Sequence, residues 1–146
     1  MLSQRGRYAL KAMLNLARAA GDRPKQVSLI AIEENISRKF LEAIMSELRQ
    51  AGLIESTRGK LGGYRLTRTP AEITFGEIMR HTDGPLALLP CVSQKFYRRC
   101  DDCPDEGACT LRRVMADVRN KVSDILDRMT LADALTSNAP ILAELE

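Results

Sequence analysis

Four cysteines lie close together in one stretch of the chain, and their thiols are the side chains here best suited to holding a metal. They are Cys91, Cys100, Cys103 and Cys109, with eight, two and five residues between successive members. The surrounding segment is irregular, with several prolines and glycines, and it contains every cysteine of the 146-residue chain. Structural cysteines would instead be scattered through the apolar stripes of helices. The cluster therefore predicts a site built from thiols.

The compartment decides which thiol chemistry to expect. Arg5, Arg7 and Lys11 interrupt the apolar runs of the first twenty residues, which argues against a secretory signal, and no later segment approaches the length of a membrane span. We therefore expect a cytoplasmic protein without a membrane partner, in which thiols stay reduced and disulfides are disfavoured. Zinc held by four thiolates and an iron–sulfur cluster both remain open.

Charge is distributed unevenly along the chain. Residues 1–68 carry thirteen Lys and Arg against six Asp and Glu, a net charge of +7, whereas the remainder carries nine against thirteen, a net charge of −4. Nucleic-acid binding begins with neutralisation of phosphates, so the basic half predicts a polyanionic partner.

Apolar periodicity predicts three helices in the basic half. Tyr8 to Ala17 recur at helical spacing, and a second, short helix is expected with Ser28 as its N-cap and with Ile30, Ile32 and Ile36 on its buried side. Ser37 is expected to cap a third helix before Gly52, and the apolar stripe of that helix is Phe40, Leu41, Ile44, Met45 and Leu48. Two helices joined by a short turn are the helix-turn-helix arrangement.

A β-hairpin is expected directly after this unit. Leu53 to Thr57 and Tyr64 to Leu66 are predicted strands, and the glycine-rich turn at 58–63 joins them. Cations crowd this turn, since Arg58, Lys60 and Arg65 lie within or beside it. A glycine-rich turn alone indicates only a surface hairpin. Its place after a helix-turn-helix favours a wing that contacts phosphates or a minor groove.

Three segments carry a family resemblance: Leu2 to Leu10, Ser37 to Glu42, and Arg58 to Tyr64. With Ile73 to Ile78 and Thr130 to Asp133, they resemble the IscR-type family of bacterial winged-helix regulators over nearly the whole chain. The resemblance implies a homodimer on a partly palindromic DNA operator, with the helix from Ser37 in the major groove and the wing beside it.

The expected DNA-binding residues lie in the first turns of that helix and in the wing turn. They are Ser37, Arg38, Lys39, Glu42, Arg58 and Lys60. Arg38 and Lys39 can donate to guanine or phosphate. Glu42 is either a specificity element that accepts from a cytosine amine or a solvated surface charge, and the resemblance favours specificity.

The same resemblance bears on the cysteines. In cluster-carrying members of the family, three loop cysteines bind the cluster and a fourth ligand comes from elsewhere; the usual spacing is five residues between each pair, often with a His three positions after the last. Here Cys103 and Cys109 have that spacing, Cys91 matches after an insertion, and Arg112 stands at the His position. We expect Cys91, Cys103 and Cys109 to bind an iron–sulfur cluster, with two iron and two sulfur atoms favoured, zinc as the alternative, and Cys100 as the candidate fourth ligand.

A second long apolar stripe follows the cysteines, at Leu111, Val114, Met115, Val118, Val122, Ile125, Leu126 and Met129. A long helix outside a small domain has little of its own chain to cover it, so this stripe predicts a dimerisation helix. We expect a mainly α fold with a small β-hairpin, divided into a winged helix-turn-helix domain (1–83), a cysteine-containing sensor loop (84–109), a dimerisation helix with a C-terminal segment (110–136) and a tail (137–146).

No catalytic motif occurs at a meaningful spacing, and we expect a protein that is not an enzyme. His81 is the only histidine, and we interpret it as a structural, partly exposed side chain. The predicted function is a DNA-binding transcriptional regulator, a repressor, controlled by an iron–sulfur cluster. The alternative is a cofactor-free or zinc-containing regulator of the same family that responds to thiol oxidation or to a protein partner.

Overall fold

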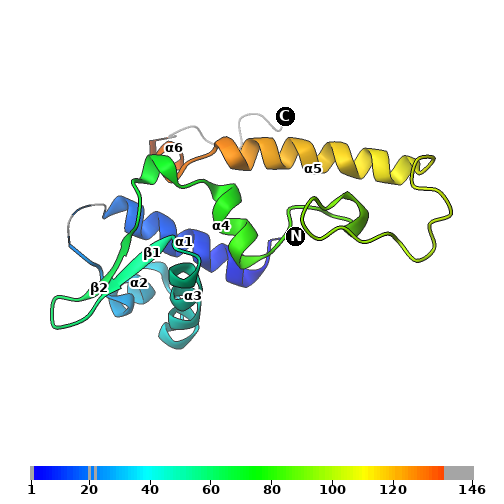
Figure 1. The fold of residues 1–146 in the computed structure, drawn as a ribbon. Coiled ribbons are helices and arrows are strands. Elements are labelled where there is room, and N and C mark those ends of the chain that lie inside the picture. Colours follow the sequence, from blue (N-terminus) through cyan, green and yellow to red (C-terminus); the bar gives the residue numbers. More distant parts are fainter. Residues whose placement is uncertain (1, 20, 22, 137–146) are drawn as a thin grey trace.

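The computed structural model describes residues 2–19, 21 and 23–136. Figure 1 shows a helical head, formed by the first half of the chain, and a long helix that begins above the loop at 83–109 and runs back to the head. The elements are α1 (Gln4–Arg18), α2 (Val27–Glu34), α3 (Arg38–Gln50), β1 (Ile54–Thr57), β2 (Gly63–Leu66), η1 (Pro70–Glu72), α4 (Phe75–Thr82), η2 (Pro90–Val92), α5 (Thr110–Arg128) and α6 (Leu131–Thr136). The mainly helical fold with one hairpin is confirmed.

The helix-turn-helix forms as the periodicity predicts. Asn35 ends α2 in the left-handed conformation, with φ of 53°, and the chain enters α3 two residues later, after Ser37. On α3 the buried side chains are Leu41, Ile44, Met45 and Leu48. Gly52 follows the helix with φ of +76°, a conformation that favours glycine, and the Leu53 amide then donates to the Leu48 carbonyl.

Three details of the expected helices are wrong. Gln26, not Ser28, is the N-cap of α2, and its side chain makes no capping hydrogen bond. Ile32 is 77% exposed, because α2 is short and only one side of it meets the core. Phe40 is also exposed rather than part of the α3 stripe; its ring packs edge-on against Tyr8, with 5.7 Å between ring centroids.

The hairpin forms where it was expected and is anchored to the helices. β1 and β2 pair antiparallel, with Ile54 opposite Leu66 and Ser56 opposite Tyr64. The Tyr64 and Lys25 backbones exchange two hydrogen bonds of 2.8 Å, which extends the pairing to the segment before α2. A side chain on Gly63 would collide with the Lys25 carbonyl, so this close approach requires a glycine.

The chain leaves the head at α4 and comes back to it at α6. After α5, Leu131 is fully buried in the head and its amide donates to the Ile73 carbonyl, while the Phe75 amide donates to the Met129 carbonyl. By contrast, α5 contains no buried residue, although it is nineteen residues long. Leu111, Val114 and Ile125 are at least half exposed. Within one protomer, the apolar stripe of α5 is therefore only partly covered: Met115, Val118 and Leu126 are half-buried, and the rest of the stripe is exposed.

No helix in the described ranges combines the length and the apolar character that crossing a membrane would require.

Candidate functional site

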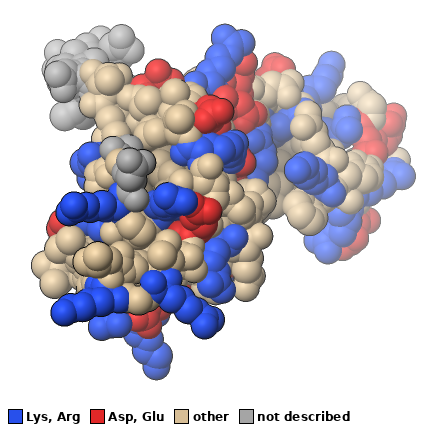
Figure 2. Space-filling view, turned by 60° about the vertical axis from the view of Figure 1, so that its left-hand side comes forward, with Lys and Arg blue, Asp and Glu red and all other residues tan. Residues whose placement is uncertain are grey.

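The structure places the six expected DNA-binding residues on the surface, on α3, its N-cap and the turn of the hairpin. Ser37, Arg38, Lys39, Glu42, Arg58 and Lys60 are all exposed. Basic side chains crowd the lower end of the molecule in Figure 2, which is the end that carries α3 and the hairpin in Figure 1. This end therefore offers a positively charged surface on a helix whose opposite face is fixed in the core.

Two of the three charged side chains in the first turns of α3 are paired with one another. Arg38 Nε lies 2.9 Å from Glu42 Oε1, one helical turn away. Glu42 is thus neutralised within its own helix, which lowers its repulsion of a phosphate. Lys39, Arg58 and Lys60, in contrast, form no ion pair with any described residue, so their charges are available to a partner.

Contacts that the sequence did not reveal hold α3 and the hairpin in place. On α1, Arg5 Nε donates to Glu47 Oε2 of α3 at 2.8 Å. On the other side, the Gln26 side chain donates to the Lys60 carbonyl at 3.5 Å, which links the start of α2 to the hairpin turn. These contacts fix the cationic surface relative to the core rather than leaving it on a free loop.

A buried polar group, Asn15, was also missed. Its Oδ1 accepts from Lys25 Nζ at 2.7 Å, and its Nδ2 donates to Glu33 Oε2 at 2.9 Å and Glu34 Oε1 at 2.8 Å. The hydrogen bond from Lys25, followed by that from Asn15, holds the pKa of Glu33 below its ordinary value of 4.5. The one sequence signal for this buried group is that Asn15 lies between Leu14 and Leu16. An apolar run predicts burial, and a buried amide needs hydrogen-bond partners.

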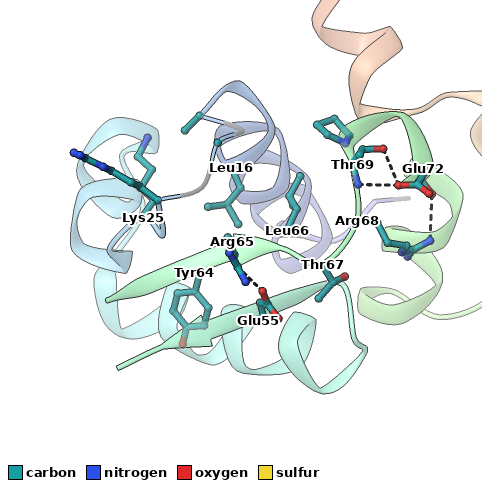
Figure 3. A pocket seen from close by; sticks show the side chains of 14 residues that line it. Leu16, Lys25, Glu55, Tyr64, Arg65, Leu66, Thr67, Arg68, Thr69 and Glu72 are labelled. Carbon is teal, nitrogen blue, oxygen red and sulfur yellow. Dashed lines mark hydrogen bonds and ion pairs between the residues drawn. The ribbon is translucent and has the colours of Figure 1, made fainter. Parts of the chain in front are cut away.

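A cavity of about 620 Å³ lies behind the hairpin, bordered by the end of α1 and by the segment from Tyr64 to Glu72 (Figure 3). Its charged side chains largely satisfy one another. Arg65 pairs with Glu55 across the hairpin, Arg68 pairs with Glu77 at 2.6 Å, and the Thr69 amide donates to Glu72 at 2.9 Å. Paired groups of this kind stabilise the loop after β2 and leave little charge for a ligand.

The four cysteines lie in the loop between α4 and α5, and all are free thiols. Cys91, in η2, is buried at 4% exposure, and the other three are partly exposed. Cys109 is the N-cap of α5, where its Sγ accepts from the Arg112 amide at 3.4 Å. Arg112, the residue at the family's His position, donates to the Cys91 carbonyl at 3.3 Å. That arginine therefore connects the start of α5 to η2, across the loop that carries the cysteines.

The thiols form a neighbouring set rather than a closed metal site. A hydrogen bond with Cys91 is the largest cause that raises the pKa of Cys100, and Cys103 contributes a smaller, charge-based effect. Cys109 instead serves α5. In the described part of the chain, no three His, Cys, Asp or Glu side chains are arranged to hold a metal ion. The donor chemistry fits a thiolate-bound metal, and the loop would have to bring its thiols closer together to bind one.

His81 lies exposed on the last turn of α4. It faces a second cavity, between α4, the cysteine loop and α5.

Comparison with known proteins supports the resemblance. Residues 2–137 match the Rrf2 family, described as an iron-dependent transcriptional regulator. An HTH-type transcriptional regulator, rrf2-like, of Rhodobacter capsulatus is 42% identical over 100% of this chain and 99% of its own length. The structure of CymR, the global cysteine regulator of B. subtilis, is 36% identical, with a TM-score of 0.77 over 92% of this chain and 95% of that one. The structure of T. potens IscR has 32% sequence identity to this chain and a TM-score of 0.71. The match covers 92% of this chain and 85% of that one.

Proposed function

The chain belongs to the Rrf2 family of transcriptional regulators and is not an enzyme, and on that premise we propose that it is a repressor that binds an operator as a homodimer in the cytoplasm. The observation that carries the DNA-binding proposal is the surface formed by α3 and the hairpin. Lys39, Arg58 and Lys60 are exposed there without an ion-pair partner among the described residues. We assign base contacts to Ser37, Arg38, Lys39 and Glu42, and wing contacts to Arg58 and Lys60.

The geometry supports a division of labour at this surface. The Arg38–Glu42 pair presents a donor and an acceptor together, which suits a base edge. A lone cation in the wing, such as Lys60, suits phosphates, whose neutralisation supplies affinity without sequence information. Selection of bound sequences from random DNA, followed by titration, tests this: Glu42→Ala should relax the selected sequence. Lys60→Ala should weaken binding of all sequences alike, and an unaltered sequence preference in Glu42→Ala would contradict the assignment.

The homodimer proposal rests on the uncovered stripe of α5. Val114, Val122 and Ile125 are exposed at 38–62% on one face of the helix. The opposite face of α5 makes the intrachain contacts, for example the ion pair of Asp127 with Arg80 of α4. A second copy of α5 is therefore the natural cover for the stripe. It would set the spacing of the two recognition helices, roughly 34 Å for half-sites one helical turn apart.

We also propose that the cysteine loop is the sensor, with Cys91, Cys103 and Cys109 as ligands of an iron–sulfur cluster and Cys100 as the fourth ligand. Relatives named IscR and the family's description as iron-dependent support this choice over zinc. A bound two-iron, two-sulfur cluster would supply a redox-active group held by thiolates. On this chain the loop thiols would have to rearrange to bind it, and Cys109, the N-cap of α5, would connect the cluster to the start of that helix. Binding of the cluster in the loop would thereby affect the start of α5.

Protein purified without oxygen tests the sensor. Iron and acid-labile sulfide should be present in stoichiometric amounts, and Cys103→Ala and Cys109→Ala should lose both. Cys100→Ala distinguishes the fourth ligand, since retention of the cluster would assign that position to another group. Stoichiometric zinc without sulfide would contradict the cluster and leave the DNA-binding proposal intact.

One observation favours a second candidate signal, oxidation of the thiols themselves. Cys91 and Cys100 lie in the same loop, and the Cys91 thiol is close enough to be the main cause that raises the pKa of Cys100; closeness of this kind is what a disulfide needs. A peroxide would be the oxidant: it takes two electrons from the two thiols, the S–S bond forms, and the two protons leave with the reduced oxygen as water. Mass spectrometry of peroxide-treated, metal-free protein would show a loss of two hydrogens between the peptides of Cys91 and Cys100.

A further inference from the structure

The second cavity lies at the junction of the head, the loop and the long helix. It has a volume of about 540 Å³ and is separate from the hairpin surface. Its walls come from α4, the loop segments on either side of η2, and α5. The lining residues are Glu77, Arg80, His81, Gly84, Pro85, Leu86, Ala87, Ser93, Gln94, Lys95, Phe96, Arg119 and Ser123. None of the four cysteines is among them.

An arginine without a partner stands in the α5 wall. Arg119 Nε is buried and has no hydrogen-bond partner in the described part of the chain. A buried guanidinium nitrogen left unpaired costs free energy, so native proteins normally provide an acceptor for it. The carboxylate in the same cavity wall does not, because Glu77 is paired with Arg68. The acceptor that Arg119 lacks is therefore one that would enter the cavity.

The remaining charges favour an anion of modest charge. Lys95 stands exposed at the rim and forms no ion pair with a described residue, so it adds a second free cation. A phosphate is usually surrounded by a glycine-rich loop or the start of a helix. The walls offer no glycine-rich loop, and their one residue from the first turn of a helix, Glu77, is itself acidic. A planar guanidinium instead matches a carboxylate, whose two oxygens accept its parallel N–H groups.

The rest of the cavity is apolar enough to hold more than a carboxylate. Pro85, Leu86, Ala87 and Phe96 contribute hydrocarbon, and Phe96 is 65% exposed at this side of the loop. Ligand sites in proteins commonly combine such walls with a few convergent polar groups. We propose that this cavity binds a small organic carboxylate with an apolar body, with Arg119 as the principal contact of the carboxylate and Lys95 at the entrance.

Binding of 3-phenylpropanoate to the full-length chain, measured by isothermal titration calorimetry, tests the proposal. We expect saturable binding with a Kd below about 10 mM. We expect no binding of 3-phenylpropanamide, which has the same shape without the charge. Arg119→Met should weaken binding at least tenfold, and Lys95→Gln should weaken it by a smaller factor. Arg113→Met is the matched control, because it removes an exposed arginine from another position of α5 and should leave binding unchanged.

Three results would overturn the proposal: no saturable binding of 3-phenylpropanoate, equal binding of the amide, or undiminished binding by Arg119→Met. A dimer-to-monomer change in Arg119→Met with binding intact would identify its guanidinium as a subunit contact instead. Should Arg119→Met fail to fold, the comparison of Lys95→Gln with wild type and the carboxylate–amide pair decide alone. DNA affinity is not the readout, so failure here is distinguishable from failure of the repressor proposal.

Discussion

Two helices of this molecule, α3 and α5, are both amphipathic, yet only α3 buries its apolar face. α3, with thirteen residues, buries four apolar side chains in the head, whereas α5, with nineteen, buries none. The head closes its core within one chain, since α1, the hairpin and α6 all return to α3 or its neighbours. Amphipathic periodicity therefore predicts that one face of a helix is covered, but it does not identify the chain that covers it.

The largest loss of folding stability should come from truncating a buried apolar side chain of α3. Leu48→Ala removes a fully buried side chain of α3, and we expect it to lower the free energy of unfolding by about 2–5 kcal/mol. Ile125→Ala on α5, where the side chain is 62% exposed, should lower it by less than about 0.5 kcal/mol in a monomeric chain. Urea denaturation measures both free energies of unfolding. The Ile125 change is made in the monomeric variant Val122→Asp, which is described below.

Equal losses in the two variants would contradict the contrast. They would show that α5 is covered by its own chain and that its exposure in one protomer has no bearing on assembly.

The second prediction concerns the uncovered side. Val122→Asp puts a charge into the exposed stripe of α5, and desolvating that charge in a helix–helix contact should prevent dimerisation. Sedimentation should then show monomers, and affinity for an operator with two half-sites should fall at least a hundredfold, roughly 2.7 kcal/mol. Asn120→Asp is the control, because Asn120 is exposed outside the stripe. A Val122→Asp protein that still sediments as a dimer would place the interface elsewhere.

The same comparison explains what could be predicted from the sequence. The stripe of α3, the glycine after it and the hairpin were predictable because local periodicity and turn chemistry agree with the tertiary structure there. Ile32 and Phe40 were misjudged, since only the angle at which a helix meets its neighbours decides which apolar residues stay outside. Asn15 was missed for a similar reason: its partners Lys25 and Glu34 are distant in sequence.

The cysteine loop was predictable in composition and not in arrangement. Clustering of four thiols marks a site, yet the spacing does not show that Cys109 caps α5 or that Arg112 reaches the Cys91 carbonyl. Irregular loops lack the repeating backbone hydrogen bonds that make helices and strands readable from periodicity. The roles of the six residues on α3 and the hairpin also stay predictions, because exposure and charge do not by themselves identify a contact.

The third prediction separates a free cation from a paired one on the hairpin. Arg58, in the turn, forms no ion pair with the described residues, whereas Arg65 on β2 is paired with Glu55. Arg58→Ala should weaken operator binding by roughly 1–3 kcal/mol if it reaches a base edge, and Arg65→Ala should weaken it less. Titration at several salt concentrations measures both. Unchanged affinity and salt dependence in Arg58→Ala would remove the hairpin from the DNA interface.

The smallest expected effect lies where the head meets α5. Arg80 of α4 donates two hydrogen bonds to Asp127 of α5, of 2.5 and 2.8 Å. The hydrogen bond from Arg80 is the main cause that lowers the pKa of Asp127 from its ordinary value of 3.8, against an opposing effect of burial. Because both side chains are at least a third exposed, solvent screens the pair, and Asp127→Asn should cost only about 0.2–1 kcal/mol of folding stability.

The pH dependence of that cost follows from the direction of the pKa shift. A carboxyl whose pKa is lower in the folded chain stabilises the fold above its unfolded pKa, here about 3.8, and loses that contribution as the pH falls through the folded pKa. Wild type and Asp127→Asn should therefore differ in urea denaturation at pH 7, and the difference should shrink below pH 3.8. Asp124→Asn, which breaks the more exposed pair with Arg128 inside α5, should cost less at every pH. If Asp127→Asn and Asp124→Asn behaved alike, the pair with Arg80 would not hold α5 to the head, and the buried contact of Leu131 would be left to do so.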